Sequence, residues 1–68
     1  MEYCFAENLR RERKSRGLTQ SELANRVGVS QTIVSQWEST ERYPTLDKIY
    51  DIANVLKISV SALVDASS

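Results

Sequence analysis

The sequence contains no histidine, and Cys4 is its only cysteine. Catalysis by a Ser–His or Cys–His pair is therefore excluded, and so is a zinc site built from the usual cysteine and histidine ligands. A single cysteine cannot form an internal disulfide, which fits a reducing compartment. We therefore expect a protein that is not an enzyme and that needs no metal or other cofactor.

An excess of charge of one sign is also missing, because nine basic residues balance nine acidic residues. Many nucleic-acid-binding domains have an isoelectric point above about 9, whereas that of this sequence is near 6.2. The basic residues are nevertheless clustered in one short segment that contains Arg10, Arg11, Arg13, Lys14 and Arg16. Any surface that attracts anions is therefore expected to be local.

Long apolar runs, internal repeats and low-complexity segments are absent as well. No apolar run is long enough to span a bilayer, and the chain does not open with a signal-peptide pattern. A length of 68 residues predicts one domain over residues 1–68, of modest stability. We expect a soluble cytoplasmic protein without a membrane partner or a small-molecule substrate.

Glycine and proline are scarce, so each marks a boundary between helical segments. Gly17 is expected to end the first helix and Gly28 the second, while Pro44 follows the third. Apolar spacing and capping residues predict helices over Tyr3–Arg16, from Thr19 to Gly28, over Gln31–Glu38 and Leu46–Leu56, and from a cap at Ser59 to Val64.

The segment from Thr19 to Glu38 has the strongest local signals. Thr19 and Glu22 have the spacing of a capping box, which predicts the start of a helix. Gly28 and a capping Ser30 leave a connection of only about three residues before the next helix, typical of a helix-turn-helix corner.

The helix predicted over Gln31–Glu38 has two different faces. Val34 and Trp37 fall together on one side, and Trp37 is expected in the core. The opposite side carries only amides and hydroxyls, from Gln31, Thr32, Ser35 and Gln36. These groups can donate and accept hydrogen bonds, as reading base edges in a major groove requires. Taken alone, the pattern also fits an uncharged face that is simply solvated.

Arg13 lies on the same helical stripe as Phe5 and Leu9, which are expected to face the core. An unpaired buried charge is strongly unfavourable, so Arg13 needs an acidic partner.

The chain resembles the phage-repressor/Cro-like helix-turn-helix family, the XRE-type transcriptional regulators. The resemblance runs from about Leu9 to Leu63 and depends on Leu18-Thr19-Gln20, Glu22-Leu23-Ala24, Val27-Gly28-Val29-Ser30, Val34, Glu38, Pro44, Ile52-Ala53 and Leu56. It implies an all-α bundle of five short helices, with the helix-turn-helix at about residues 19–38 and the third helix in the major groove. Thr40 departs from the family, which usually has a glycine at this position.

The resemblance also implies roles for individual residues. Gln31, Thr32 and Gln36 match base-contacting positions, and Ser35 lies between them on the same face. Gln20 matches a phosphate-contacting glutamine, and Ser30, Arg42 and Tyr43 are further phosphate candidates. Arg13 and Glu38 match an ion pair between the first and third helices.

The apolar residues near the end of the chain allow two interpretations. Leu46, Ile49, Ile52, Ala53 and Leu56 form a stripe that is expected to be core. Ile58, Val60, Leu63 and Val64 are more apolar residues than one short helix can bury alone, so we expect them to form a dimer interface. The alternative is that all four complete the core.

The function expected from this resemblance is a sequence-specific transcriptional regulator of a bacterium or phage. It would act as a repressor that binds double-stranded DNA as a homodimer on a two-fold symmetric operator. The alternative is an antitoxin or adaptor on the same fold that binds a protein, because a fold does not determine function.

Overall fold

The computed structural model describes residues 4–65, which form five α-helices joined by short connections. The helices are α1 (Phe5–Ser15), α2 (Gln20–Val27), α3 (Gln31–Glu38), α4 (Leu46–Leu56) and α5 (Val60–Val64). The predicted all-α fold is thus confirmed, and no strand occurs in the described part of the chain. The predicted start of the first helix at Tyr3 lies outside the described residues.

Capping residues explain where the helices begin and end. The Thr19 side chain accepts a hydrogen bond from the Glu22 backbone N–H, and the Glu22 carboxylate accepts one from the Thr19 N–H, so the predicted capping box is present. Ser30, Thr45 and Ser59 cap α3, α4 and α5 in the same way through their hydroxyls. Gly28 ends α2 in the left-handed region at φ 90°, which glycine adopts without steric penalty.

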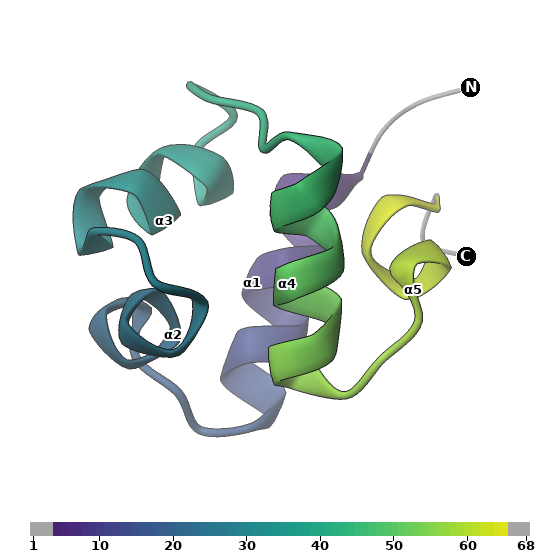
Figure 1. Ribbon diagram of the computed structural model, residues 1–68, viewed down its shortest axis with the longest axis horizontal. Helices are drawn as coiled ribbons and strands as arrows, with labels where there is room; N and C mark the ends of the chain where they lie inside the picture. Colours follow the sequence, from purple (N-terminus) through teal and green to yellow (C-terminus); the bar gives the residue numbers. More distant parts are fainter. Residues whose placement is uncertain (1–3, 66–68) are drawn as a thin grey trace.

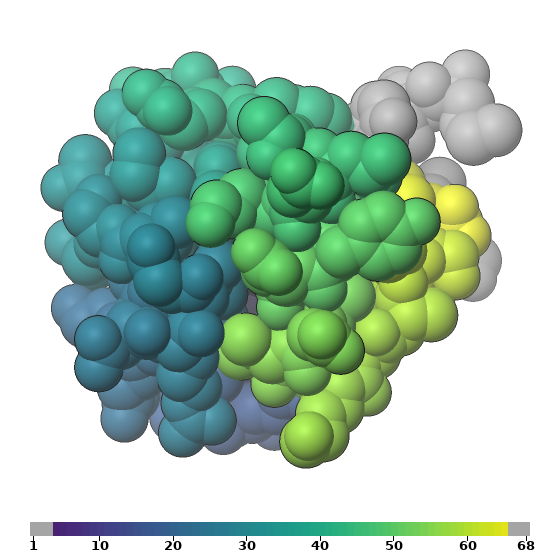
Figure 2. Space-filling view, in the orientation of Figure 1, coloured from purple at the N-terminus to yellow at the C-terminus, as the bar shows by residue number. Residues whose placement is uncertain are grey.

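The arrangement of the helices places α1 and α4 in the middle of the molecule. The α2–α3 unit lies on one side of them and α5 on the other, with α1 behind α4 in this view (Figure 1). In the space-filling view, α4 separates the surface of α2 and α3 from the surface of α5 (Figure 2). α1 contacts both α3 and α5 and therefore connects the two sides of the molecule.

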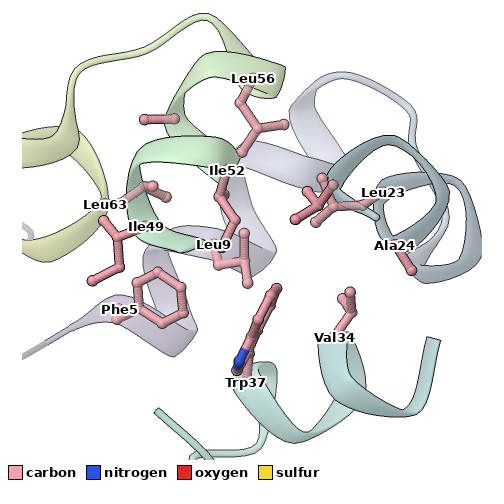
Figure 3. Packing of buried hydrophobic residues seen from close by; sticks show 12 residues of the cluster. Phe5, Leu9, Leu23, Ala24, Val34, Trp37, Ile49, Ile52, Leu56 and Leu63 are labelled. Atoms are coloured by element: carbon pink, nitrogen blue, oxygen red, sulfur yellow. The ribbon is translucent and has the colours of Figure 1, made fainter. Parts of the chain in front are cut away.

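The core lies where the five helices meet and draws residues from each of them. Figure 3 shows Trp37 reaching from α3 toward Leu9 of α1, and Trp37 is only 2% exposed, as predicted. The buried apolar side chains are Phe5, Leu9, Leu23, Ala24, Val27, Val34, Trp37, Ile49, Ile52, Ala53, Leu56 and Leu63.

One residue of the predicted α4 stripe is not in the core. Leu46 is 62% exposed, whereas Ile49, one turn further on, is 7% exposed. A helical wheel gives the direction of a side chain but not whether another element reaches that level of the helix. Leu46 is the first residue of α4 and its side chain remains largely in solvent, so its assignment to the core was wrong.

Candidate nucleic-acid interface

The buried face of α3 holds the helix rigidly against the rest of the domain. Val34 is fully buried and Trp37 nearly so. At the start of the helix, the Ser30 hydroxyl accepts a hydrogen bond from the Ile33 N–H at 3.3 Å. The opposite face of α3 is therefore presented in a fixed orientation.

The outer face of α3 is uncharged, as predicted, but its four polar residues are not equally available. Gln31 and Thr32 are exposed, whereas Ser35 and Gln36 are half-buried. The Gln36 side-chain oxygen is buried and has no hydrogen-bond partner. The first turn of α3 is therefore open to a ligand, and Gln36 can use its oxygen only after its side chain moves outward.

A chain of hydrogen bonds connects this surface to the interior. Gln31 donates from Nε2 to Oε1 of Gln20 at 2.7 Å, and Gln20 donates from Nε2 to Oε1 of Glu38 at 3.0 Å. No local signal in the sequence predicted this connection, because Gln20 lies 11 positions from Gln31 and 18 positions from Glu38. The helix-turn-helix corner creates it by bringing the start of α2 beside α3.

The inner end of this chain is the predicted ion pair, which the structure confirms. Arg13 donates from Nε to Oε2 of Glu38 at 2.6 Å and from Nη2 to Oε1 at 3.0 Å. A third donation, from Nη1, reaches the Leu18 carbonyl at 2.8 Å. The hydrogen bonds to Glu38 raise the pKa of Arg13 above its ordinary value and outweigh the opposite effect of burial. The pair is bidentate and shielded, so it fixes α3 on α1 in one geometry.

The α3–α4 connection begins with a tight turn. Thr40 has φ 67°, and the Glu41 N–H bonds to the Gln36 carbonyl, as in helix ends that normally use glycine. Thr40 at the position of a family glycine is therefore accommodated in the left-handed region.

Further along this loop, Tyr43 and Arg42 are both exposed, as phosphate contacts require. The Tyr43 ring lies against Phe5, with 5.9 Å between centroids and 60° between planes. The loop is thereby attached to α1, while about half of Tyr43 stays accessible.

The α5 region corrects one predicted interface residue. Leu63 is fully buried and belongs to the core, so it presents no surface to a second protomer and its assignment to the interface was wrong. Its side chain points inward because α5 packs against both α1 and α4. Ile58, Val60 and Val64 pack on the core but remain partly exposed.

Other kinds of site find no support in the described residues. No cluster of three or more histidine, cysteine, aspartate or glutamate side chains there could hold a metal ion. None of the helices within residues 4–65 has the length and apolar character to cross a membrane.

Comparison with known proteins identifies the class. Residues 9–63 match the helix-turn-helix family, so the chain belongs to this family of DNA-binding transcriptional regulators. It is 37% identical over 57 residues to the cryptic phage CTXφ transcriptional repressor RstR of Vibrio cholerae, covering 84% of this chain and 51% of RstR. It is 33% identical over 60 residues to the transcriptional activator BcrR of Enterococcus faecalis, covering 88% of this chain and 29% of BcrR. The chain thus spans about half the length, or less, of these two relatives.

The structure also resembles solved members of the class. The P22 c2 repressor, crystallised with a synthetic operator, matches with a TM-score of 0.86 and 30% identity over 93% of this chain and 96% of that one. The fold also occurs as one part of HppE, an enzyme, with a TM-score of 0.85 and 32% identity over 94% of this chain but only 34% of HppE. The same domain therefore serves in proteins of different function, whereas the family that matches here is one of regulators.

Proposed function

We propose that this protein is a cytoplasmic repressor of a bacterium or phage that binds a two-fold symmetric DNA operator as a homodimer. The observation that carries the proposal is the uncharged outer face of α3, whose exposed Gln31 is held in place by the hydrogen-bond chain from the buried ion pair.

Gln31 has the hydrogen-bonding groups that adenine requires. One of its two amide protons is donated to Gln20, which leaves one donor and the side-chain oxygen for a base. Adenine presents the N7 acceptor and the N6 donor at its major-groove edge, so the remaining groups of Gln31 match it. The bond to Gln20 orients the amide before DNA arrives, which reduces the entropy lost on binding.

Thr32, Ser35 and Gln36 complete the proposed base-reading surface. Thr32 is exposed beside Gln31 and needs no rearrangement. The buried, unpaired oxygen of Gln36 is unfavourable by about 1–3 kcal/mol in the free protein. A base that donates to this oxygen would relieve that penalty, so Gln36 is proposed to turn outward when the operator binds.

Phosphate contacts would set the register of the protein on the duplex. Gln20 lies in the first turn of α2, where free backbone N–H groups and the helix dipole attract anions. It keeps one amide proton after donating to Glu38. Ser30, Arg42 and Tyr43 are exposed and provide the other proposed phosphate contacts.

The small number of charges available for DNA supports the proposed dimer. The net charge is zero, so one protomer releases few counterions and gains little non-specific affinity. A dimer makes each contact with DNA twice. Once the first protomer is bound, the second has a high effective concentration at its own half-site, so the overall affinity rises. The partly exposed Ile58, Val60 and Val64 are the proposed contact, and half-sites about 34–36 Å apart would match one turn of DNA.

The proposal is tested by selecting duplexes from a random pool and measuring the affinity of those that are enriched. Gln31→Ala should lower discrimination between bases at one position of each half-site by about 1–3 kcal/mol, with stability changed by less than about 0.5 kcal/mol. Asn25→Ala, at an exposed position of α2 outside the proposed surface, is the control and should leave discrimination unchanged.

Failure to enrich any duplex at low salt would reject the repressor function and favour the protein-binding alternative. If a palindromic sequence is enriched but Gln31→Ala has unchanged selectivity, the proposed function is supported and the bases are read by residues other than Gln31.

A further inference from the structure

The C-terminal end of α5 receives two hydrogen bonds from one buried side chain. Asn8 of α1 donates from Nδ2 to the Leu63 carbonyl at 2.9 Å and to the Asp65 carbonyl at 2.8 Å. Asn8 is only 1% exposed, and its two partners lie 55 and 57 residues away in the sequence. Both amide protons are therefore used to fix the end of a helix that is distant along the chain.

The short length of α5 makes this attachment important. A helix of five residues has almost no stability of its own, and its last carbonyls have no partner within the helix. The burial of Leu63 holds α5 against the core, but apolar contact has no directional preference. Two hydrogen bonds from one planar amide do have a direction, so they determine the position of the helix end.

Asn8 and Arg13 both lie on α1, and they attach helices on opposite sides of the molecule to it. Arg13 binds Glu38 at the end of α3, and Asn8 binds the end of α5. The two residues are about 7.5 Å apart along α1 and about 140° apart around it, from the regular helix geometry. This matches the positions of α3 and α5 on the two sides of the α1–α4 pair (Figure 1). The buried polar side chains of the described chain are Asn8, Arg13 and Glu38.

From this arrangement we infer that Asn8 is a positioning residue for the dimer contact, and that α1 sets the spacing of the two recognition helices. The inference rests on the proposed binding of an operator by a dimer. In such a dimer, the distance between the two α3 helices is determined by how each α3 sits relative to its own α5 surface. α1 determines that relation through Arg13 at one point and Asn8 at the other.

The test compares wild-type protein with Asn8→Leu, which replaces the amide with an apolar side chain of similar shape that donates no hydrogen bond. The probes are the duplex selected by the wild-type protein, the same duplex with the half-sites moved by one or two base pairs, and a single half-site. Asn25→Leu places the same side chain at an exposed position of α2 and serves as the matched control.

Asn8→Leu should bind the single half-site as wild type does, because α3 and its network remain intact. Its preference for the best spacing over the neighbouring spacings should fall roughly tenfold, the effect of losing one to two ordinary hydrogen bonds. Amide exchange in α5 should accelerate by a similar factor. A purely structural role would instead weaken binding to every probe in proportion to the unfolded fraction.

An unchanged spacing preference in Asn8→Leu would overturn the inference while leaving the proposed function intact. A wild-type protein that selects no duplex, or shows no spacing preference, would overturn the proposed function and this inference with it. If Asn8→Leu does not fold, Asn8→Ser retains one donor and should show a partial loss of spacing preference. Wild-type preference in that variant would also count against the inference.

Discussion

The α2–α3 unit and α5 are attached to α1 by different kinds of interaction. α3 is held by a charged, bidentate pair whose hydrogen bonds continue through Gln20 to Gln31 at the surface. α5 is held by burial of Leu63 and by a neutral amide that donates to the backbone carbonyls of Leu63 and Asp65. The hydrogen-bond network that holds α3 thus extends to a side chain at the surface, whereas the two bonds from Asn8 end on backbone carbonyls at the C-terminal end of α5.

The largest effect is expected from the substitution that breaks the attachment of α3 to α1. Glu38→Ala leaves Arg13, which is only 8% exposed, without its partner. Removing one member of a buried pair typically lowers the free energy of unfolding by about 3–5 kcal/mol. The free energy of unfolding is measured by urea denaturation, monitored through the fluorescence of Trp37, the only tryptophan.

Glu41→Ala, in the exposed loop that follows, is the control and should change stability by less than about 0.5 kcal/mol. A similarly small effect of Glu38→Ala would mean that the pair does not fix α3. Replacing both partners, Arg13→Met with Glu38→Leu, should be less destabilising than Glu38→Ala alone, because no buried charge remains unpaired.

The second effect tests the attachment of α5. Leu63→Ala removes a fully buried side chain and should lower the free energy of unfolding by about 2–5 kcal/mol. Val60→Ala, on the partly exposed side of α5, should lower it by about 1 kcal/mol or less. Thermal or urea unfolding separates the two, and sedimentation shows whether dimerisation changes. Weaker dimerisation for Leu63→Ala without loss of stability would return Leu63 to the interface.

The helix-turn-helix half was predicted well because its signals are local. The Thr19–Glu22 capping box, Gly28 and Ser30 each act through bonds within a few residues, so the sequence alone locates them. The partnership of Arg13 with Glu38 came from the family resemblance and from the rule that a charge on a core stripe needs a partner. Nothing in the spacing of Gln20 and Gln31 indicated their hydrogen bond, which depends on how two helices pack.

The other half was predicted less well because the apolar pattern gives the direction of a side chain but not whether another element covers it. Leu46 and Leu63 were expected in the core and in the interface, respectively, and the structure places each in the opposite environment. The hydrophobic pattern cannot tell which neighbouring helix covers a residue. The role of Asn8 had no sequence signal either, since an asparagine in a helix looks like an ordinary exposed residue.

The smallest effect concerns the turn that follows α3. Thr40 has φ 67°, a region that is unfavourable by about 1–2 kcal/mol for residues other than glycine. Glycine removes this strain but loses about 0.5–1 kcal/mol of backbone entropy on folding. Thr40→Gly should therefore raise the free energy of unfolding by up to about 1.5 kcal/mol.

Thr45→Gly is the matched control, because Thr45 has φ −70° and its hydroxyl caps α4 by accepting from the Lys48 N–H. This substitution relieves no strain and removes a cap, so it should lower stability by a few tenths of a kcal/mol or more. The same change thus has opposite signs at two positions five residues apart. If Thr40→Gly also lowers stability in urea denaturation, the hydrogen bond from the Thr40 hydroxyl to the Ser39 carbonyl outweighs the backbone strain. The side chain, rather than the backbone, would then determine the shape of the turn.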